Sequence, residues 1–227
     1  MADGMQCRIS SRLSDQSSLS IQQKYLMSRL SRKYVMAKGW ETYLKLFVHP
    51  PKPLSYTPGY LQPIEGRFLH WLARRVPKHG LALEVGSFKG KSTCFIASSL
   101  DPSARLACVD TWLCDAMPYD NPGDVMSEFL ENVSGYLNTI ETHRGKSVDV
   151  AATWNRPIDL LFIDGDHSYE GCSDDLKAWF RFVKPGGWIA FHDSGEEGVA
   201  RAISDFFPTS LRGSEISVWS VFAAIKR

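Results

Sequence analysis

The sequence of 227 residues lacks the features that mark several classes of protein. Its five cysteines are scattered and form no C-x-x-C pair, so zinc-ribbon and dithiol redox sites are not indicated. No apolar run approaches the roughly 20 residues that cross a bilayer, and no apolar signal core follows the polar first residues. These absences predict a cytoplasmic protein with reduced, mostly buried thiols and no membrane partner.

An excess of either charge is also missing. The chain carries 26 Lys and Arg against 25 Asp and Glu, a formal net charge of +1. No long-range field therefore favours nucleic acid or an anionic membrane surface. The 44% of hydrophobic residues are enough for one sizeable core. We predict one domain with an N-terminal appendage and no nucleic-acid partner.

The first third of the chain shows no strand pattern. Residues 1–20 are rich in Ser, Arg and Asp without periodicity, which predicts a poorly ordered terminus. From Ile21 to Phe47, and again from Pro63 to Arg75, apolar residues recur at helical spacing. We predict a helical extension over residues 21–76 that packs as core, covers a substrate or contacts a second copy in a homo-oligomer. The main domain is then residues 77–227.

After Pro77, short apolar runs alternate with helix-length segments, which is typical of βαβ units. Strands are expected at 81–85, 104–109, 139–143, 158–163, 188–191 and 215–225, with a short one near Ser210. Helices are expected at 92–99, 124–137, 146–154, 169–182 and 198–206. This order predicts an α/β fold with a Rossmann-like, doubly wound, mostly parallel seven-stranded sheet. Ligands of such sheets bind beyond the carboxyl ends of the strands.

A glycine-containing turn follows the first expected strand. The segment reads Leu-Ala-Leu-Glu-Val-Gly-Ser-Phe-Lys-Gly-Lys-Ser-Thr, with Glu84 near the strand end and glycines at 86 and 90. Glycines let the backbone turn tightly and approach a ligand, and the helix start offers free N–H donors. An ordinary strand-to-helix loop is the simpler alternative.

Two phosphate-binding motifs differ from this turn by their spacing. A dinucleotide fingerprint needs a glycine where the chain has Phe88, so that interpretation fails. A P-loop needs four residues between its glycines, whereas Gly86 and Gly90 enclose three. A P-loop-like nucleotide hydrolase stays as an alternative.

The turn resembles motif I of the class I S-adenosylmethionine-dependent methyltransferases. The resemblance is carried by Glu84-Val-Gly86-Ser87-x-x-Gly90-x-Ser92-Thr93. It implies that the glycines pass beneath the methionine part of S-adenosylmethionine and that the acidic residue organises the amino end of that cofactor.

Polar residues after the second and third strands extend the expected cofactor site. Asp110 ends the second strand, where a carboxylate can accept hydrogen bonds from both ribose hydroxyls, and Thr111 and Trp112 follow it. Trp112 either stacks near an adenine or packs in the core. Gly145 and Ser147 follow the third strand, where the resemblance implies contact with the adenine, although Ser147 also suits a plain helix cap.

The fourth strand ends in three ionisable residues within four positions, Asp164, Asp166 and His167. His192 and Asp193 end the fifth strand, and neighbouring parallel strand ends are expected to lie close together. Crowded ionisable groups at the ligand edge of a sheet are candidates for a site. His167 titrates near neutrality, so it is the first candidate for a general base and Asp166 is the second.

These runs resemble a more specific methyltransferase family over about Leu81 to Phe206. Asp-Gly-Asp-His-Ser-Tyr-Glu-Gly, Lys-Pro-Gly-Gly-Trp and Phe-His-Asp are similar to macrolide-sugar and aminocoumarin-sugar O-methyltransferases and cephalosporin hydroxylase-like proteins. The resemblance implies a Mg²⁺ ion held at Asp164, His192 and Asp193, with Asp164 also near the cofactor. His192 departs from the family's carboxylate and favours a softer ion such as Mn²⁺.

The leading hypothesis is therefore a metal-assisted O-methyltransferase that uses S-adenosylmethionine and a small hydroxylated acceptor, such as a sugar or secondary metabolite. A non-catalytic protein that binds S-adenosylmethionine is the other alternative.

Overall fold

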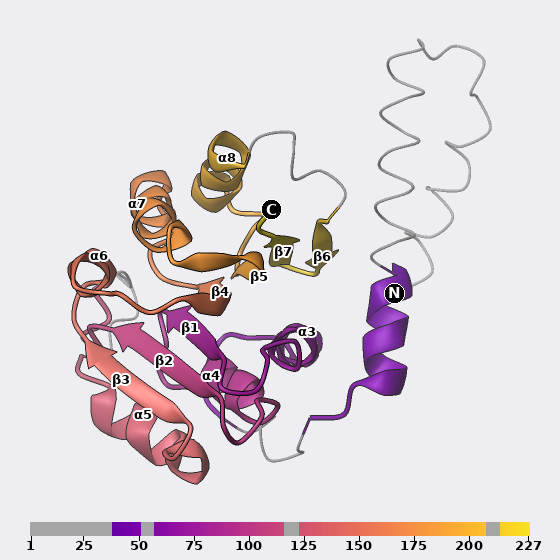
Figure 1. Ribbon diagram of the computed structural model, residues 1–227, viewed down its shortest axis with the longest axis horizontal. Helices are drawn as coiled ribbons and strands as arrows, with labels where there is room; N and C mark the ends of the chain where they lie inside the picture. The colour runs from indigo at the N-terminus through magenta and orange to yellow at the C-terminus, as the bar shows by residue number, and fades with distance from the viewer. Residues whose placement is uncertain (1–37, 51–56, 116–122, 208–213) are drawn as a thin grey trace, which may run out of the picture. The chain divides into compact units, whose positions relative to one another are not determined.

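The computed structural model describes residues 38–50, 57–115, 123–207 and 214–227 of the chain (Figure 1). The chain divides into two units, Met1–Trp40 and Glu41–Arg227. In the first unit, residues 38–40 are described and are helical. In the second, residues 41–47 are helical and Leu44 is fully buried. The terminus predicted over 1–20, the helices predicted over 21–37 and the strand predicted near Ser210 lie outside the described residues.

The second unit is built on a sheet that has seven strands in the described part of the chain. Its order is β3-β2-β1-β4-β5-β7-β6. The strands are β1 (Leu81–Val85), β2 (Arg105–Asp110), β3 (Ile140–Arg144), β4 (Ile158–Ile163), β5 (Val183–Phe191), β6 (Ile216–Val218) and β7 (Val221–Ile225). The first five are parallel, and β7 runs antiparallel to both β5 and β6. The predicted mostly parallel, seven-stranded Rossmann-like sheet is confirmed.

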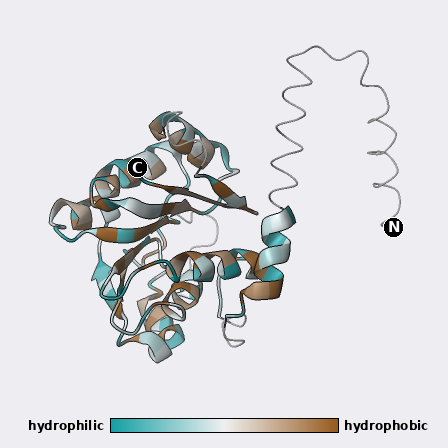
Figure 2. Cartoon of the chain, turned by 45° about the vertical axis from the view of Figure 1, so that its right-hand side comes forward, coloured by the Kyte–Doolittle hydropathy of each residue, from teal (hydrophilic) through white to brown (hydrophobic). Residues whose placement is uncertain are grey.

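Helices cover both faces of this sheet (Figure 1). They are α3 (Pro63–Ala73), α4 (Lys91–Ala97), α5 (Met126–Asn132), α6 (Ser147–Ala152), α7 (Tyr169–Phe180) and α8 (Glu197–Phe206). One core cluster joins alternate strand residues such as Leu83 and Leu161 to Leu176 and Trp179 of α7. All five residues of β1 are buried, as expected for a central strand with helices on both sides. Figure 2 shows the central strands mainly in the hydrophobic colour.

The structure corrects three expected element boundaries. The predicted strand over 215–225 is a hairpin, because Trp219 turns the chain with a φ of 54° between β6 and β7. The fifth strand starts at Val183, and its pairing with β4 skips the Lys-Pro-Gly-Gly stretch before resuming at Trp188. The predicted helix over 124–137 is α5 followed by a 3₁₀ turn at Ser134–Tyr136, where Ser and Gly are weak helix formers.

No helix in the described residues is long and apolar enough to cross a membrane. Cys94, Cys108, Cys114 and Cys172 are buried free thiols, as predicted, and Cys7 lies outside the described residues. α3 belongs to the same compact unit as the sheet, although we predicted it as part of an N-terminal extension.

Candidate active site

The glycine turn between β1 and α4 brings the backbone of two strand ends into contact. Gly86 has a φ of 85°, and a Cβ atom there would lie 2.0 Å from the carbonyl oxygen of Asp164. Gly90 has a φ of 87° and precedes α4, and a Cβ atom there would lie 2.7 Å from a methyl group of Val133. Both positions therefore require glycine, because of the left-handed backbone and the close neighbours.

Glu84 lies under this turn and is fully buried. Its Oε2 accepts hydrogen bonds from the hydroxyls of Ser87, at 2.8 Å, and Thr93. Its Oε1 has no hydrogen-bond partner among the described residues. Burial raises the pKa of Glu84 to about 7. Of the predicted cofactor residues, Glu84, Gly90 and Thr93 line neither of the cavities below, so in this structure they support the turn from beneath.

The first cavity, of about 580 Å³, lies beyond the carboxyl ends of β1, β2 and β4. Among the predicted cofactor residues, its lining includes Gly86, Asp110, Thr111, Gly145, Ser147 and Asp164. Seven lining residues are acidic, and Lys146 is the one basic residue among those described along its wall. Such a wall disfavours phosphate groups and suits a cationic ligand.

Asp110 is fixed by the backbone on both sides of it. Its Oδ2 accepts from the Phe88 N–H at 2.7 Å and its Oδ1 from the Trp112 N–H, also at 2.7 Å. Burial raises the pKa of Asp110 above its usual value, against those hydrogen bonds. Each oxygen keeps a further lone pair for a ligand. Trp112 itself is fully buried, packs 4.9 Å from the Phe129 ring and lines neither cavity, so it lies in the core.

Asp175 of α7 is a lining residue to which we assigned no role from sequence. It is buried, and burial raises its pKa to about 6. The Ser147 hydroxyl lies in the same network and accepts a hydrogen bond from Trp179 Nε1 at 2.7 Å. The available sequence signal was its position in the motif Asp-Asp-Leu, nearly two turns into the helix that follows the acidic run.

The second cavity, of about 470 Å³, adjoins the first. The two share Gly86, Phe88, Asp164, Gly165, Asp166 and Ser168 in their walls. Tyr60 and Phe88 line one side, with ring centroids 6.1 Å apart and nearly parallel planes. Ser87, Ser92 and His167 also line this cavity. The lining of this cavity therefore combines aromatic and ionisable side chains.

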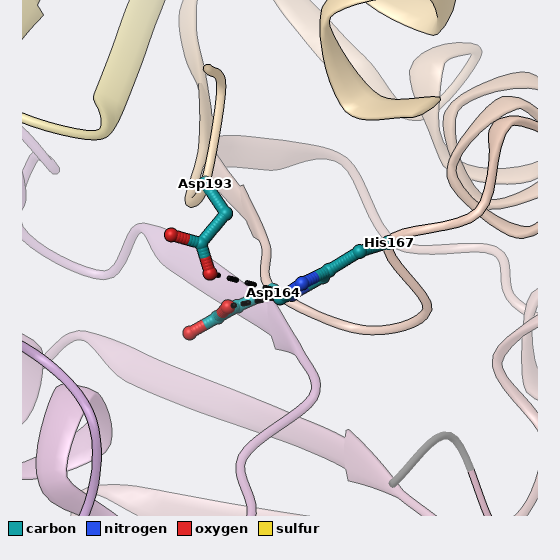
Figure 3. Close-up of side chains that lie close together, drawn as sticks. All are labelled: Asp164, His167 and Asp193. Atoms are coloured by element: carbon teal, nitrogen blue, oxygen red, sulfur yellow. Dashed lines mark ion pairs between the residues drawn. The ribbon is translucent and has the colours of Figure 1, made fainter. Parts of the chain in front are cut away.

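The ionisable wall brings together Asp164 directly after β4, His167 from the same loop and Asp193 after β5 (Figure 3). Nε2 of His167 lies 3.7 Å from Asp164 Oδ1 and 3.6 Å from Asp193 Oδ2. Its Nδ1 lies 3.2 Å from Glu196. The interaction with Asp164 raises the pKa of His167 above its usual value. Asp166 instead accepts a hydrogen bond from the Ser168 N–H at 2.8 Å, at the start of α7.

These three residues also fit a divalent cation. One donor atom from each lies within 4.8 Å of the others. Ligands about 2.1 Å from one octahedral ion lie roughly 3 Å apart, so binding an ion needs the donors to draw closer by up to about 1.8 Å. This group of donor atoms contains Asp164 and Asp193 of the three predicted metal ligands, with His167 as the histidine and not His192.

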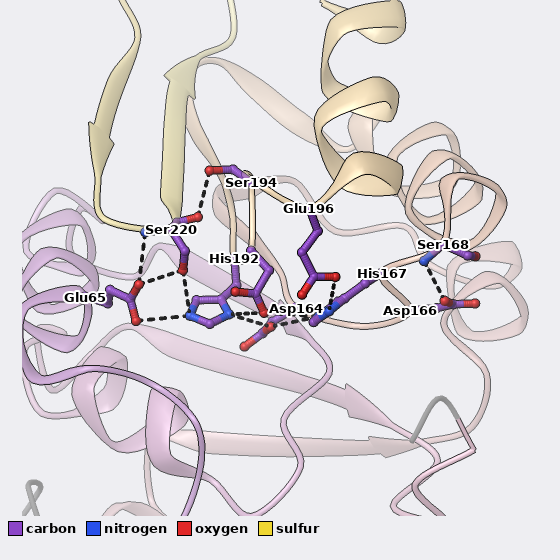
Figure 4. Close-up of polar contacts among 10 residues, drawn as sticks. Glu65, Asp164, Asp166, His167, Ser168, His192, Ser194, Glu196 and Ser220 are labelled. Carbon is purple, nitrogen blue, oxygen red and sulfur yellow. Dashed lines mark hydrogen bonds and ion pairs between the residues drawn. The ribbon is translucent and has the colours of Figure 1, made fainter. Parts of the chain in front are cut away.

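Both ring nitrogens of His192 face carboxylates (Figure 4), and His192 is not part of the donor group formed by Asp164, His167 and Asp193. Nδ1 lies 3.0 Å from Asp193 Oδ2 and 3.3 Å from Asp164 Oδ1, and Nε2 lies 3.2 Å from Glu65 Oε2. Burial acts to lower the pKa of His192, but these hydrogen bonds raise it well above its usual value. Sequence reasoning missed Glu65, which lies in α3, far from the other residues in the chain.

Ser220, His192 and Asp193 follow one another in the order of a hydrolytic triad, with Ser220 Oγ 3.3 Å from His192 Nε2. However, the Ser220 hydroxyl donates to Glu65 at 2.6 Å, and Ser220 lines neither cavity. The arrangement therefore offers no accessible nucleophile.

Comparison with known proteins assigns the fold. The three proteins of known structure that follow share it at 16 to 18% identity, which shows the fold alone. The O-methyltransferase from Bacillus cereus in complex with SAH has a TM-score of 0.59 and 16% identity, covering 86% of this chain and 100% of that chain. The O-methyltransferase TomG from Streptomyces achromogenes in complex with SAM has a TM-score of 0.58 and 18% identity, covering 86% and 99%. The SAH-bound Podospora anserina methyltransferase PaMTH1 has a TM-score of 0.61 and 16% identity, covering 84% and 95%.

Sequence comparison points the same way. A stretch of 116 residues is 47% identical to the uncharacterized protein R132 of Acanthamoeba polyphaga mimivirus and covers 49% of this chain. The chain spans about half the length of that curated relative, as the match covers 50% of it. Residues 83–194 match a family model described as a methyltransferase domain. The family match and the shared fold agree: residues 83–194 are similar to a methyltransferase domain, and the chain shares its fold with methyltransferases of known structure.

Proposed function

We propose that this protein transfers the methyl group of S-adenosylmethionine to a hydroxyl of a small molecule held in the second cavity. The observation that carries the proposal is the adjacency of the two cavities. One is an acid-lined pocket at the glycine turn and the other is walled by aromatic and ionisable side chains, and they share Gly86 and Asp164. Small hydroxylated molecules such as sugars or secondary metabolites fit such a mixed wall.

The first cavity supplies the contacts that S-adenosylmethionine needs. Asp110 lines this cavity and is our candidate acceptor for the ribose hydroxyls, and the turn at Gly86 allows close backbone approach. The sulfonium carries a positive charge, which the acidic wall stabilises. The same wall argues against the P-loop-like nucleotide hydrolase, because triphosphates would meet seven acidic residues. The complexes of the Bacillus cereus and Streptomyces achromogenes enzymes with SAH and SAM support this choice of cofactor.

The second cavity supplies the base. S-adenosylmethionine, when bound, provides an already activated methyl group, so the protein must align the acceptor and take its proton. His167 lines this cavity with its ring held between Asp164, Asp193 and Glu196, and we assign it the proton of the acceptor hydroxyl. Asp166 is the weaker candidate, since its carboxylate caps the turn before α7. With a divalent ion held at Asp164, His167 and Asp193, the His167 ring would be a ligand instead of the base; the ion would then lower the pKa of the acceptor hydroxyl, and Asp166 would be the remaining candidate base.

Cofactor binding tests the proposal first. At a hundred times its dissociation constant, S-adenosylmethionine or its demethylated product should add about 2.7 kcal/mol to the free energy of unfolding. ATP with Mg²⁺ serves as the control and should give no such increase. A melting temperature unchanged by both S-adenosyl compounds would contradict the proposal.

Turnover measurements test the second part of the proposal, the transfer of the methyl group to a hydroxyl. Across a panel of sugars, phenols and other hydroxylated acceptors, formation of the demethylated product should depend on His167 and Asp164. Replacing His167 with Ala should abolish turnover while S-adenosylhomocysteine still binds, whereas replacing Asp164, which lines both cavities, should abolish turnover and weaken that binding as well. Cofactor binding without turnover on any acceptor would instead favour a non-catalytic binding protein.

A further inference from the structure

Glu65 is a buried carboxylate that lines neither cavity and is nevertheless tied to the ionisable wall. It is 2% exposed and lies in the first turn of α3. Its Oε2 accepts from the Gln62 N–H at 2.8 Å and from His192 Nε2 at 3.2 Å. Its Oε1 accepts from the Ser220 N–H at 3.1 Å and from the Ser220 hydroxyl at 2.6 Å. A helix cap needs the Gln62 bond alone, so the other three bonds serve something else.

The bond to His192 continues into the site (Figure 4). With Nε2 of His192 held by Glu65, Nδ1 points between Asp193 Oδ2, at 3.0 Å, and Asp164 Oδ1, at 3.3 Å. The same two oxygen atoms face Nε2 of His167 from the other side, at 3.6 and 3.7 Å. A continuous chain of contacts therefore runs from Glu65 through His192 and the carboxylate pair to His167.

We propose that Glu65 is a positioning residue for the ionisable wall: it fixes the ring of His192, which holds Asp164 and Asp193 in the arrangement that orients His167. The physical reason is that an imidazole ring turns about its bond to the chain unless both nitrogens are bonded. Without Glu65, Nε2 of the buried His192 ring loses its charged partner and keeps only the Ser220 hydroxyl at 3.3 Å, so the ring is held less firmly. The carboxylates lose the fixed position of their shared donor with it. The assignment of His167 as the base rests on the proposed function, but the positioning itself does not.

A purely structural role is the competing explanation. Glu65 also joins α3 to the turn between β6 and β7 through Ser220. The two explanations differ in what His167 experiences, because His167 has no contact with Ser220 or with α3 among those found in the described residues. Ser220→Ala removes the hydroxyl's hydrogen bond to Glu65 and its 3.3 Å contact with Nε2 of His192, and leaves the bond between Glu65 and His192.

The test is NMR of the ring nitrogens in protein labelled with ¹⁵N-histidine, without any ligand. Glu65→Gln keeps the size of the side chain, and we expect it to shift the ring signals of both His192 and His167. His192→Asn should shift the His167 signals at least as far. In the double variant Glu65→Gln/His192→Asn, the His167 signals should match those of His192→Asn alone, since Glu65 acts through His192.

Two controls separate positioning from stability. Glu131→Gln changes an exposed carboxylate of α5 and should leave His167 unchanged. Ser220→Ala should shift His167 much less than Glu65→Gln does. The proposal would be overturned if Glu65→Gln leaves the His167 signals unshifted, or if Ser220→Ala shifts them as far as Glu65→Gln does. If Glu65→Gln does not fold, His192→Asn still decides, because unchanged His167 signals in that variant would overturn it as well.

Binding and turnover then distinguish this proposal from the proposed function. S-adenosylhomocysteine should bind Glu65→Gln as tightly as wild type, since Glu65 does not line the first cavity. With an acceptor from the panel, kcat should fall at least about tenfold in Glu65→Gln at an unchanged KM for S-adenosylmethionine. An unchanged kcat would overturn the positioning role. Failure of wild type to bind either S-adenosyl compound would refute the proposed function and leave the NMR test standing.

Discussion

Replacing Gly86 with alanine should damage the domain more than the same change at any glycine that lies in open space. The backbone of Gly86 donates to the Val109 carbonyl at 2.9 Å, and the Asp164 N–H donates to the neighbouring Val85 carbonyl at 2.9 Å. The turn therefore lies where β1, β2 and β4 end side by side. A new Cβ atom would lie 2.0 Å from the Asp164 carbonyl oxygen and 2.5 Å from its carbon.

Two contributions set the size of the effect. The φ of 85° places alanine in a left-handed conformation, which costs about 1–2 kcal/mol. Ordinary contact begins near 3.4 Å, so the backbone at Asp164 must move by about 1.4 Å. Movements of this kind in a packed site typically cost about 1–3 kcal/mol. We expect Gly86→Ala to lower the free energy of unfolding by about 2–5 kcal/mol and to weaken binding of S-adenosylhomocysteine.

Two other glycines separate these contributions. Gly186 has a φ of 82° and nothing within 4 Å of its would-be Cβ among the described residues, so Gly186→Ala should cost about 1–2 kcal/mol. Gly135 has neither feature, and Gly135→Ala should stay within about 0.5 kcal/mol of wild type. Urea unfolding of the three variants measures the differences. A Gly86→Ala variant no less stable than Gly186→Ala would refute the argument from close approach.

Three further predictions concern single side chains. The pKa of Glu84 is about 7 in the folded state, against 4.5 when unfolded. As the pH rises from 4.5 to 7, the free energy of unfolding of wild type should therefore fall by about 3 kcal/mol relative to that of Glu84→Gln. Unfolding at pH 4.5 and pH 8 checks this, and an equal gap at both pH values would contradict it. In Asp110→Asn, the N–H of either Phe88 or Trp112 would face the amide NH₂ instead of an oxygen. The free energy of unfolding should fall by about 1–3 kcal/mol, and calorimetry should show weaker cofactor binding. Trp179→Phe and Ser147→Ala should show a coupling energy of about 1 kcal/mol in a double-mutant cycle, and additive effects would argue against their hydrogen bond.

The central strands could be predicted from sequence because burial on both faces makes their apolar runs continuous. β1 and β4 begin and end at the predicted residues. The two strands of the β6–β7 hairpin could not be distinguished in the sequence. The turn between them is made by Trp219 in a left-handed conformation, and no glycine or proline marks it. Its conformation depends on packing rather than on local preference.

The candidate site was predictable where it follows strand ends and not elsewhere. Asp164 and Asp193 lie together because β4 and β5 pair in parallel, with Ile163 opposite Phe191. The sequence could not decide whether His167 or His192 would point toward a metal. The orientation of His192 depends on the partner of its second ring nitrogen, and that partner is Glu65 in α3. An acidic residue in the first turn of a helix is ordinary, so its sequence context gave no reason to connect it with residues more than a hundred positions away. Trp112 likewise had two equal interpretations until its burial was known.

The hydrogen bond between Glu65 and Ser220 joins residues 155 positions apart. Closing so long a stretch of chain is slow compared with forming local turns, and the loop entropy is lost before the contact forms. The first cavity depends on β1, β2, β4 and the helices next to them, whereas the ionisable wall also needs β7 docked on β5. A newly made or refolding chain should therefore acquire its cofactor pocket before its proton acceptor is in place. In a refolding time course, binding of S-adenosylhomocysteine should precede turnover.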